Sequence, residues 1–203
     1  MPLGRVLLVR HGETDYNTTG RWQGQLDTPL NLLGRQQAEK VALALRNVPL
    51  SLIVSSDLSR AADTARAIAA HHGLTPVLDA RWREIHLGIF QGLTRQEIKE
   101  IYPLEYNSWH HDDNFVVPNG ESRLQVQKRA HEAWLSLTER PDLEGTALVT
   151  AHGGTIRWLL IRLFGEEATL GRHLENTSIT TLERSEDGAW VMRKVGDVAH
   201  LQV

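Results

Sequence analysis

Residues 6–14, VLLVRHGET, decide the fold of this chain. The first four are apolar and mostly branched, which is typical of a short parallel strand buried on both faces. The apolar run stops at Arg10 and His11, and Gly12 follows where the backbone has to turn. Because ligands in an open α/β sheet bind just outside the carboxyl ends of the strands, this stretch predicts a functional site that contains Arg10 and His11.

Strand-like and helical patterns alternate along the remainder of the chain. The expected strands are 6–9, 52–54, 77–78, 147–151, 179–182 and 190–195. The expected helices follow the N-cap candidates Asn31, Asp57 and Thr94, and two more include residues 130–137 and 156–164. This alternation predicts an α/β fold, a three-layer αβα sandwich with a mostly parallel sheet. A turn at Asp187-Gly188 joins the last two strands and gives the sheet an antiparallel C-terminal edge.

The length of 203 residues predicts a single domain over residues 1–203. The sequence contains no internal repeat and no long linker. The stretch 102–122 has the least regular pattern and is rich in aromatic, His, Asp and Pro residues. We expect it to form a lid-like insertion that borders a pocket.

Composition excludes several classes of protein. A net charge of -3 argues against a surface that coats nucleic acid. The absence of cysteine excludes disulfides, thiolate zinc sites and a cysteine nucleophile. No apolar stretch is long enough to span a bilayer, and the first strand begins too early to leave room for a signal peptide. We therefore expect a cytoplasmic enzyme that binds neither nucleic acid nor membrane.

Residues suited to phosphoryl transfer lie where expected strands end or helices begin. The reaction needs a nucleophile, an acid for the leaving group and fixed positive charge around the phosphoryl oxygens. His11 and His152 each follow a strand, Arg60 lies in a first helical turn, and Glu84 lies in a loop before Gly88. The planar, permanently charged guanidinium of arginine suits phosphate.

Six ordered segments resemble the histidine phosphatase superfamily, also called the phosphoglycerate mutase-like family, and in particular its small bacterial phosphatases. The first contains Arg10, His11, Gly12 and Asn17. The others are 27–38, 55–65, 84–93, 118–122 and 149–154. A single Arg-His-Gly would be a weak signal, but ordered segments along nearly the whole chain are a strong one.

The resemblance implies a role for each candidate. His11 would attack phosphorus and become a phosphohistidine, and Glu84 would protonate the leaving oxygen and later activate water. The implied catalytic residues are His11, Glu84, His152, Arg10 and Arg60. The implied substrate-binding residues are Arg10, Asn17, Gln23, Gly24, Arg60, Glu84, His152 and Gly153. No metal and no cofactor are implied. Gly153 stands where the acid-phosphatase branch has its proton-donating Asp, which favours Glu84 as the donor.

Three alternatives to a phosphatase stay open. One is a cofactor-dependent phosphoglycerate mutase, but mutases typically carry Glu-Arg-His-Tyr-Gly where this chain has residues 84–88, EIHLG. Cations for a substrate carboxylate are few there, with Arg95 and Lys99 nearest in the sequence. The others are a non-catalytic phosphate-binding module and a metal-dependent hydrolase. The favoured interpretation is a phosphomonoesterase for a small phosphorylated metabolite, active as a monomer or homodimer.

Aromatic residues suggest how a leaving group is held. Trp22, Trp82, Trp109 and Phe115 are candidates for an apolar pocket wall, and Trp134 and Trp158 are expected in the core. Residues 110–113, HHDD, match no metal-ligand spacing, so we expect them to form a polar lid or a loop that contacts substrate.

Overall fold

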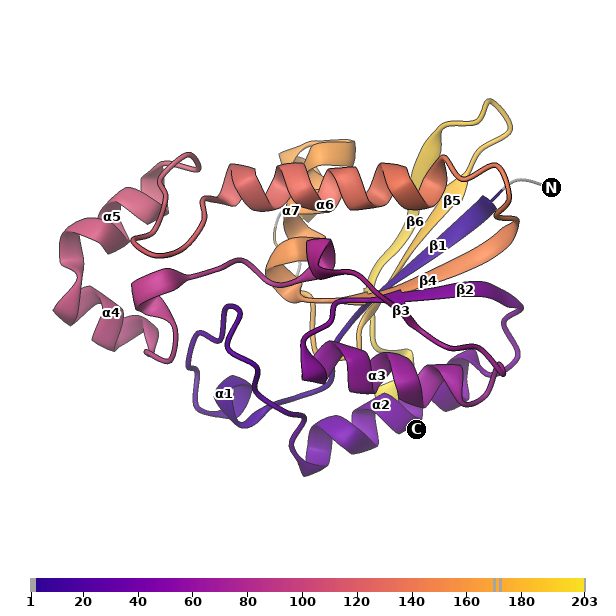
Figure 1. The fold of residues 1–203 in the computed structure, drawn as a ribbon, viewed down its shortest axis with the longest axis horizontal. Helices are drawn as coiled ribbons and strands as arrows, with labels where there is room; N and C mark the ends of the chain where they lie inside the picture. The colour runs from indigo at the N-terminus through magenta and orange to yellow at the C-terminus, as the bar shows by residue number, and fades with distance from the viewer. Residues whose placement is uncertain (1–2, 170, 172, 203) are drawn as a thin grey trace.

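The computed structural model describes residues 3–169, 171 and 173–202. Its strands are β1 (Leu3–Arg10), β2 (Leu50–Ser55), β3 (Val77–Leu78), β4 (Gly145–Ala151), β5 (Ile179–Arg184) and β6 (Trp190–Asp197). They form one sheet in the order β3-β2-β4-β1-β5-β6 (Figure 1). β3, β2, β4 and β1 run parallel, and β5 and β6 are antiparallel. The predicted α/β fold with an antiparallel C-terminal edge is confirmed.

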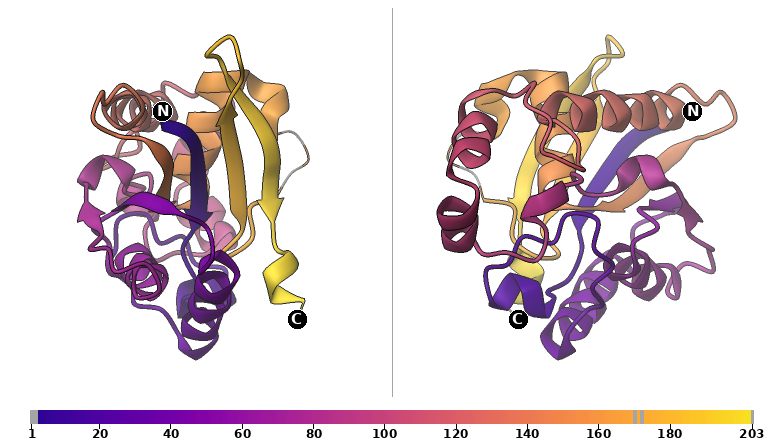
Figure 2. Two further views of the ribbon diagram at one scale, coloured as in Figure 1. Left: turned by 90° about the vertical axis from the view of Figure 1, so that its right-hand side faces the viewer. Right: turned by 60° about the vertical axis from the view of Figure 1, so that its left-hand side comes forward.

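Helices cover both faces of this sheet. The helices of the described chain are α1 (Asp15–Thr18), α2 (Leu32–Leu45), α3 (Ser59–Ala69), α4 (Arg95–Ile101), α5 (Pro103–His111), α6 (Arg123–Thr138) and α7 (Gly153–Phe164). Short 3-10 turns are η1 (Ala80–Trp82), η2 (Gly88–Phe90), η3 (Glu166–Thr169) and η4 (Ala199–Leu201). α6 and α7 lie above the sheet, and α2 and α3 lie below it (Figures 1 and 2).

The alternation of side chains along β1 explains the three layers. Val6 and Leu8 pack into one buried cluster with residues of α6 and α7. Leu7 and Val9 pack into a second cluster with residues of α2 and α3. Successive residues of a strand point to opposite faces, so an unbroken apolar strand requires a helical layer on each side.

Two of the three expected helix caps are confirmed. The Asn31 side chain accepts a hydrogen bond from the Gly34 amide, and Thr94 forms a capping box with Glu97. Asp57 is not a cap: the helix begins after Leu58, which provides no side-chain cap. The Asp57 carboxylate instead forms a two-pronged ion pair with Arg83, at 2.6 Å for both contacts.

The stretch 102–122 is more regular than its sequence indicates, because α5 occupies residues 103–111 of it. Together with α4, this helix lies away from the sheet (Figures 1 and 2). It packs through a separate apolar cluster that includes Leu87, Phe90, Ile98 and Tyr106. The cluster joins the 102–122 segment to the loop that follows Glu84, so this segment borders the predicted site. Its movement as a lid stays a prediction.

Candidate active site

The carboxyl ends of β1, β2 and β4 bring the predicted residues together. Arg10 pairs with Ala151, and Ser55 pairs with Thr150, in parallel register. The amide of His11 extends the ladder by donating to Ala151 O at 3.0 Å, and the rings of His11 and His152 lie 5.1 Å apart between centroids. Residues 141 positions apart in sequence therefore share one site.

His11 is held as a neutral imidazole with one free nitrogen. It is buried, and its Nδ1 lies 2.6 Å from the carbonyl oxygen of Gly12. A carbonyl only accepts hydrogen bonds, so Nδ1 carries the proton and Nε2 keeps its lone pair. Burial lowers the pKa of His11 well below its usual value, and the charges of Arg60 and Arg10 lower it further. The arrangement suits a nucleophile at neutral pH.

Gly12 is required by a close approach between two chain segments. A Cβ at this position would lie 2.4 Å from the carbonyl oxygen of Gly34, at the start of α2. The Gly12 amide also donates to the hydroxyl of Thr64 on α3 at 3.1 Å. The turn after β1 is therefore fixed from two helices, and with it the orientation of His11.

Arg60 and Arg10 supply buried positive charge beside His11. The two terminal nitrogens of Arg60 donate to the carbonyl oxygens of Gly24 and Leu26, both at 2.7 Å. Arg10 donates to the carbonyl oxygen of Leu174 at 2.6 Å. Burial lowers the pKa of Arg60 to about 10, so its guanidinium stays charged at neutral pH. Within the described ranges, neither side chain has a hydrogen bond or ion pair with a carboxylate.

His152 is buried at the N-terminus of α7. Its Nε2 lies 2.9 Å from the hydroxyl of Ser56, the residue that follows β2. Burial, followed by the charge of Arg60, lowers the pKa of His152 well below its usual value. The sequence reasoning missed Ser56, because its role depends on a contact between two strands.

Three buried nitrogens of these residues lack a hydrogen-bond partner within the described part of the chain. They are Arg10 Nε, Arg60 Nε and His152 Nδ1. A buried polar atom without a partner costs about 1–3 kcal/mol, and here three of them belong to residues grouped around His11. Ser56 Oγ accepts from the Leu58 amide, so its hydroxyl hydrogen is left to donate to His152 Nε2, and in that tautomer Nδ1 carries the proton. All three nitrogens are then donors, and an anion with several acceptor oxygens, such as a phosphoryl group, would satisfy them.

Glu84 is fixed against the first turn of α7. Its two carboxylate oxygens accept from the amides of Gly154, Thr155 and Ile85, each at 3.0 Å. A Cβ on Gly154 would lie 2.5 Å from Glu84 Oε1, so only glycine leaves room for the carboxylate. His152 and Glu84 are thus positioned by the same helix start.

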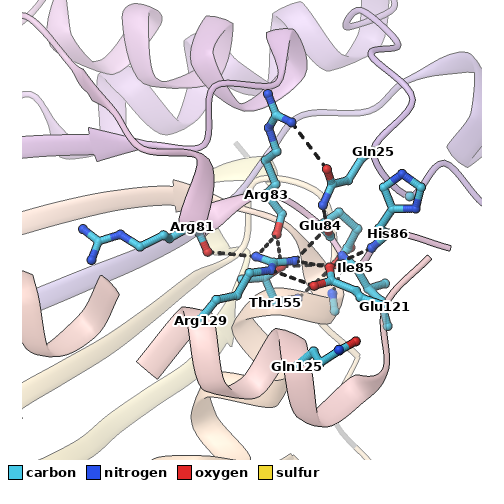
Figure 3. Close-up of polar contacts among 12 residues, drawn as sticks. Gln25, Arg81, Arg83, Glu84, Ile85, His86, Glu121, Gln125, Arg129 and Thr155 are labelled. Atoms are coloured by element: carbon cyan, nitrogen blue, oxygen red, sulfur yellow. Dashed lines mark hydrogen bonds and ion pairs between the residues drawn. The ribbon is translucent and has the colours of Figure 1, made fainter. Parts of the chain in front are cut away.

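Arg129, on α6, holds the backbone around Glu84 (Figure 3). Its guanidinium donates to the carbonyl oxygens of Arg81, Arg83 and Glu84 at 2.7–2.9 Å. It also forms a two-pronged ion pair with Glu121, at 2.6 and 3.0 Å. The sequence reasoning missed Arg129, although a charged residue beside the buried positions Val126, Ala130 and Ala133 of a helix is a usable signal.

Glu121 connects Arg129 to the loop after Glu84. Its Oε1 accepts from the His86 amide at 2.8 Å, and its own amide donates to the His86 carbonyl oxygen at 2.8 Å (Figure 3). The backbone at Gly88 also lies close to the segment 118–122, since a Cβ on Gly88 would lie 2.0 Å from the carbonyl oxygen of Pro118. The segment 118–122, which the sequence marks as a motif, therefore supports the loop that carries the proposed acid.

Six of the eight predicted substrate-binding residues line one pocket, and the other two, His152 and Gly153, do not. This phosphate pocket, of about 200 Å³, is lined by Arg10, His11, Asn17, Arg21, Trp22, Gln23, Gly24, Arg60, Glu84, Ile85 and Leu87. The Asn17 side chain also closes the capping box of α1, and Gln23 Oε1 accepts from the Thr14 hydroxyl at 2.9 Å. Gly153 borders Arg10 instead, with 3.5 Å between an added Cβ and Arg10 Nε.

A larger cavity of about 590 Å³ shares Trp22, Ile85 and Leu87 with the phosphate pocket. Trp109 and Trp158 also line it. Trp158 is half-buried and packs against the apolar cluster of Phe90 and Tyr106, so its expected place in the core is only partly right. Trp82 is the reverse case: it is 1% exposed and packs in the main core. Trp82 is the last residue of η1 and packs against residues of α6.

The cations expected to hold a carboxylate are placed elsewhere. Arg95 donates to the Tyr106 hydroxyl at 2.7 Å, and Lys99 lies 5.4 Å from the centre of the Tyr106 ring. Neither residue lines the phosphate pocket or the larger cavity. The arginines that line the larger cavity are Arg123 and Arg157. The helical spacing of α4 orients both side chains toward α5.

The described residues contain no group of three or more His, Cys, Asp or Glu side chains that could hold a metal ion. Residues 110–113 therefore form no such cluster. Within the same part of the chain, no helix has the length and apolar character needed to cross a membrane.

Comparison with known proteins identifies the family. Residues 6–198 match the histidine phosphatase superfamily (branch 1). The chain is 37% identical over 210 residues to the probable phosphoglycerate mutase GpmB of Yersinia pestis (strain Pestoides F), covering 98% of this chain and 95% of that protein.

Two solved structures are similar over nearly their full length. A mycobacterial glucosyl-3-phosphoglycerate phosphatase in complex with VO3 has a TM-score of 0.82 and 36% identity, covering 96% of this chain and 100% of that chain. A phosphoserine phosphatase of Entamoeba histolytica in complex with 3-phosphoglyceric acid has a TM-score of 0.85 and 29% identity, covering 97% and 98%. The chain belongs to the histidine phosphatase superfamily.

Proposed function

We propose that this protein is a phosphomonoesterase that hydrolyses small phosphorylated metabolites through a phosphohistidine at His11. The observation that carries the proposal is the group of three unpartnered buried nitrogens, on Arg10, Arg60 and His152, around a neutral His11. A phosphoryl group would satisfy these donors and lie within reach of the free nitrogen of His11.

In the first step, Nε2 of His11 attacks phosphorus while the bond from phosphorus to the ester oxygen breaks. Arg10, Arg60 and His152 stabilise the charge on the phosphoryl oxygens, and protonated Glu84 gives its proton to the leaving oxygen. Asn17, Gln23, Gly24 and Gly153 complete the substrate-binding set.

In the second step, the Glu84 carboxylate takes a proton from water, whose oxygen attacks the phosphohistidine. The bond from phosphorus to nitrogen breaks, phosphate leaves, and His11 returns to its neutral form. The two guanidinium groups supply the positive charge that a metal ion provides in other phosphatases. The proposed mechanism therefore uses no metal and no cofactor.

Phosphoglycerate mutase is the second candidate, because the Yersinia relative carries that name. The two activities would share His11 and differ in the fate of the phosphohistidine, which water attacks in a phosphatase and a bound acid in a mutase. The names of both similar solved structures, and residues 84–88 without the mutase arginine and tyrosine, favour the phosphatase.

The expectations on organisation belong to the same proposal. One domain over residues 1–203, with a lid at 102–122, a cytoplasmic location and a monomeric or homodimeric state stay predictions. A phosphorylated small molecule is the proposed partner, in line with the 3-phosphoglyceric acid bound by the phosphoserine phosphatase.

The test is phosphate release from 4-nitrophenyl phosphate and 3-phosphoglycerate, in the presence of a chelator, by wild type and His11→Ala. We expect release by wild type and none by the variant, with circular dichroism confirming that the variant is folded. Equal turnover by the folded variant would refute the nucleophile. Formation of 2-phosphoglycerate without phosphate release would favour the mutase.

A further inference from the structure

A second cavity, of about 270 Å³, adjoins the phosphate pocket and shares Arg10 and Glu84 with it. The rest of its wall is formed by Gly153, Gly154, Arg157, Thr169, His173, Leu174 and Val195. Because Glu84 borders both spaces, a group attached to the ester oxygen that receives its proton can extend into this second cavity. The inference that follows rests on the proposed function.

The wall of the second cavity carries more positive than negative charge. Among the described lining residues, Arg10 and Arg157 are the arginines and Glu84 is the one carboxylate. Arg157 also lines the larger cavity, but the charges there are balanced, because Arg123 is paired with Asp113 at 2.8 Å and Glu166 lines that cavity together with Arg157. An anionic substituent is therefore favoured in the second cavity.

Arg157 has its guanidinium available. It is exposed on α7, one turn after Gly153, and makes no hydrogen bond or ion pair with any residue in the described ranges. The neighbouring arginines Arg83, Arg123 and Arg129 are each paired with a carboxylate. A planar, always charged fork suits two-pronged binding of a carboxylate.

Thr169, on η3, provides an independent indication. The residue is 2% exposed, and its hydroxyl is buried without a partner among the described residues. A buried hydroxyl without a partner is costly. Thr169 lines the same cavity as Arg157. The two residues belong to η3 and α7, so each of these elements contributes a polar group without a partner among the described residues.

We propose that the second cavity is a subsite for a carboxylate on the leaving group, bound by Arg157 and assisted by the hydroxyl of Thr169. The substrates would be phosphate monoesters of small hydroxy acids. Arg157 then determines specificity, while His11, Glu84 and the phosphate-binding residues carry out the reaction.

The experiment uses two competitors of equal shape, 3-(phosphonooxy)propanoate and its carboxamide. Each is titrated against 4-nitrophenyl phosphate hydrolysis, and the ratio of the two inhibition constants is measured. A charge-assisted hydrogen bond predicts that wild type binds the carboxylate about tenfold more tightly than the amide. The ratio should fall toward about one in Arg157→Gln and fall partly in Thr169→Val.

Arg162→Gln is the matched control, because Arg162 lies on the same helix and lines none of the three cavities. It should keep the wild-type ratio. Equal inhibition by both competitors in wild type, no inhibition by either, or an unchanged ratio in Arg157→Gln would overturn the subsite while leaving the phosphatase intact. A wild type that does not hydrolyse 4-nitrophenyl phosphate would instead refute the proposed function.

Discussion

Arg129→Met should impair both stability and the proton transfer assigned to Glu84. The substitution keeps much of the side-chain length but removes five hydrogen bonds, to three carbonyl oxygens and to both oxygens of Glu121. One of those carbonyls belongs to Glu84 itself. The change therefore releases the backbone that carries the proposed acid.

The expected loss of stability follows from the burial of the ion pair. The side chains of Arg129 and Glu121 are 18% and 16% exposed, and removing one partner of a buried pair costs about 3–5 kcal/mol. Because some solvent reaches both groups, we take the lower end, about 3 kcal/mol. For a chain of this length, this corresponds to a fall in Tm of about 6–12 °C.

The expected effect on catalysis depends on the leaving group. Displacement of a catalytic group by about 1 Å can cost about 10²-fold in rate, and protonation matters most when the leaving oxygen is strongly basic. We therefore expect kcat for an alkyl phosphate to fall about 10²-fold in Arg129→Met. The fall for 4-nitrophenyl phosphate should be much smaller, with KM little changed. Initial rates for both esters, measured below the Tm of the variant, give the comparison.

Three controls separate this account from a general weakening of the fold. Arg140→Met removes an exposed arginine paired with Asp142 and should change little. In the double variant with Glu121→Gln, the stranded carboxylate is gone, so the loss of stability should be smaller than the sum of the two single losses. Arg129→Lys should recover part of the alkyl phosphate rate. A destabilised Arg129→Met that loses both activities equally, or neither, would refute the positioning role.

Two further predictions concern the acid and the buried histidines. Glu84→Gln should slow alkyl phosphates far more than aryl phosphates in initial-rate measurements, and an equal loss for both esters would contradict its role as proton donor. Burial lowers the pKa values of His11 and His152, so below about pH 6.5 the unfolded chain binds protons that the folded chain does not. The free energy of unfolding should therefore fall between pH 7 and pH 5, by up to about 1.4 kcal/mol per pH unit for each histidine. Urea unfolding without phosphate measures this, and His11→Asn should have a shallower pH slope; an equal slope would show that His11 is not the source.

Local sequence patterns predicted most of the fold. The unbroken apolar run of β1, the caps Asn31 and Thr94, and the turn at Asp187-Gly188 each depend on residues close in sequence. Such signals are readable without the tertiary structure, since helix caps, strand runs and turns are short-range interactions. Asp57 shows where local patterns fail to predict the structure. Its side chain is suited to capping a helix, but it forms an ion pair with Arg83, which is distant in sequence.

The candidate site was predicted through its ordered motifs, and the tertiary structure adds the groups that orient it. Ser56 contacts His152 across a strand pairing, and Arg129 reaches the Glu84 backbone from another helix. The sequence also did not predict that Trp82 lies in the core and that Trp158 lines a cavity. Which face of an element becomes core or cavity wall depends on the neighbours that cover it, and one sequence does not specify them.

By itself, then, the sequence determined the α/β class, the family and the identities of the residues proposed to act on phosphate. Strand ends, glycines and charged residues at those ends are local features that a linear pattern retains. Only the tertiary structure decided how these residues are oriented and where the free charge of Arg157 lies. Hydrogen bonds and cavities of this kind form between segments distant in sequence, so their geometry exists only once the layers have packed.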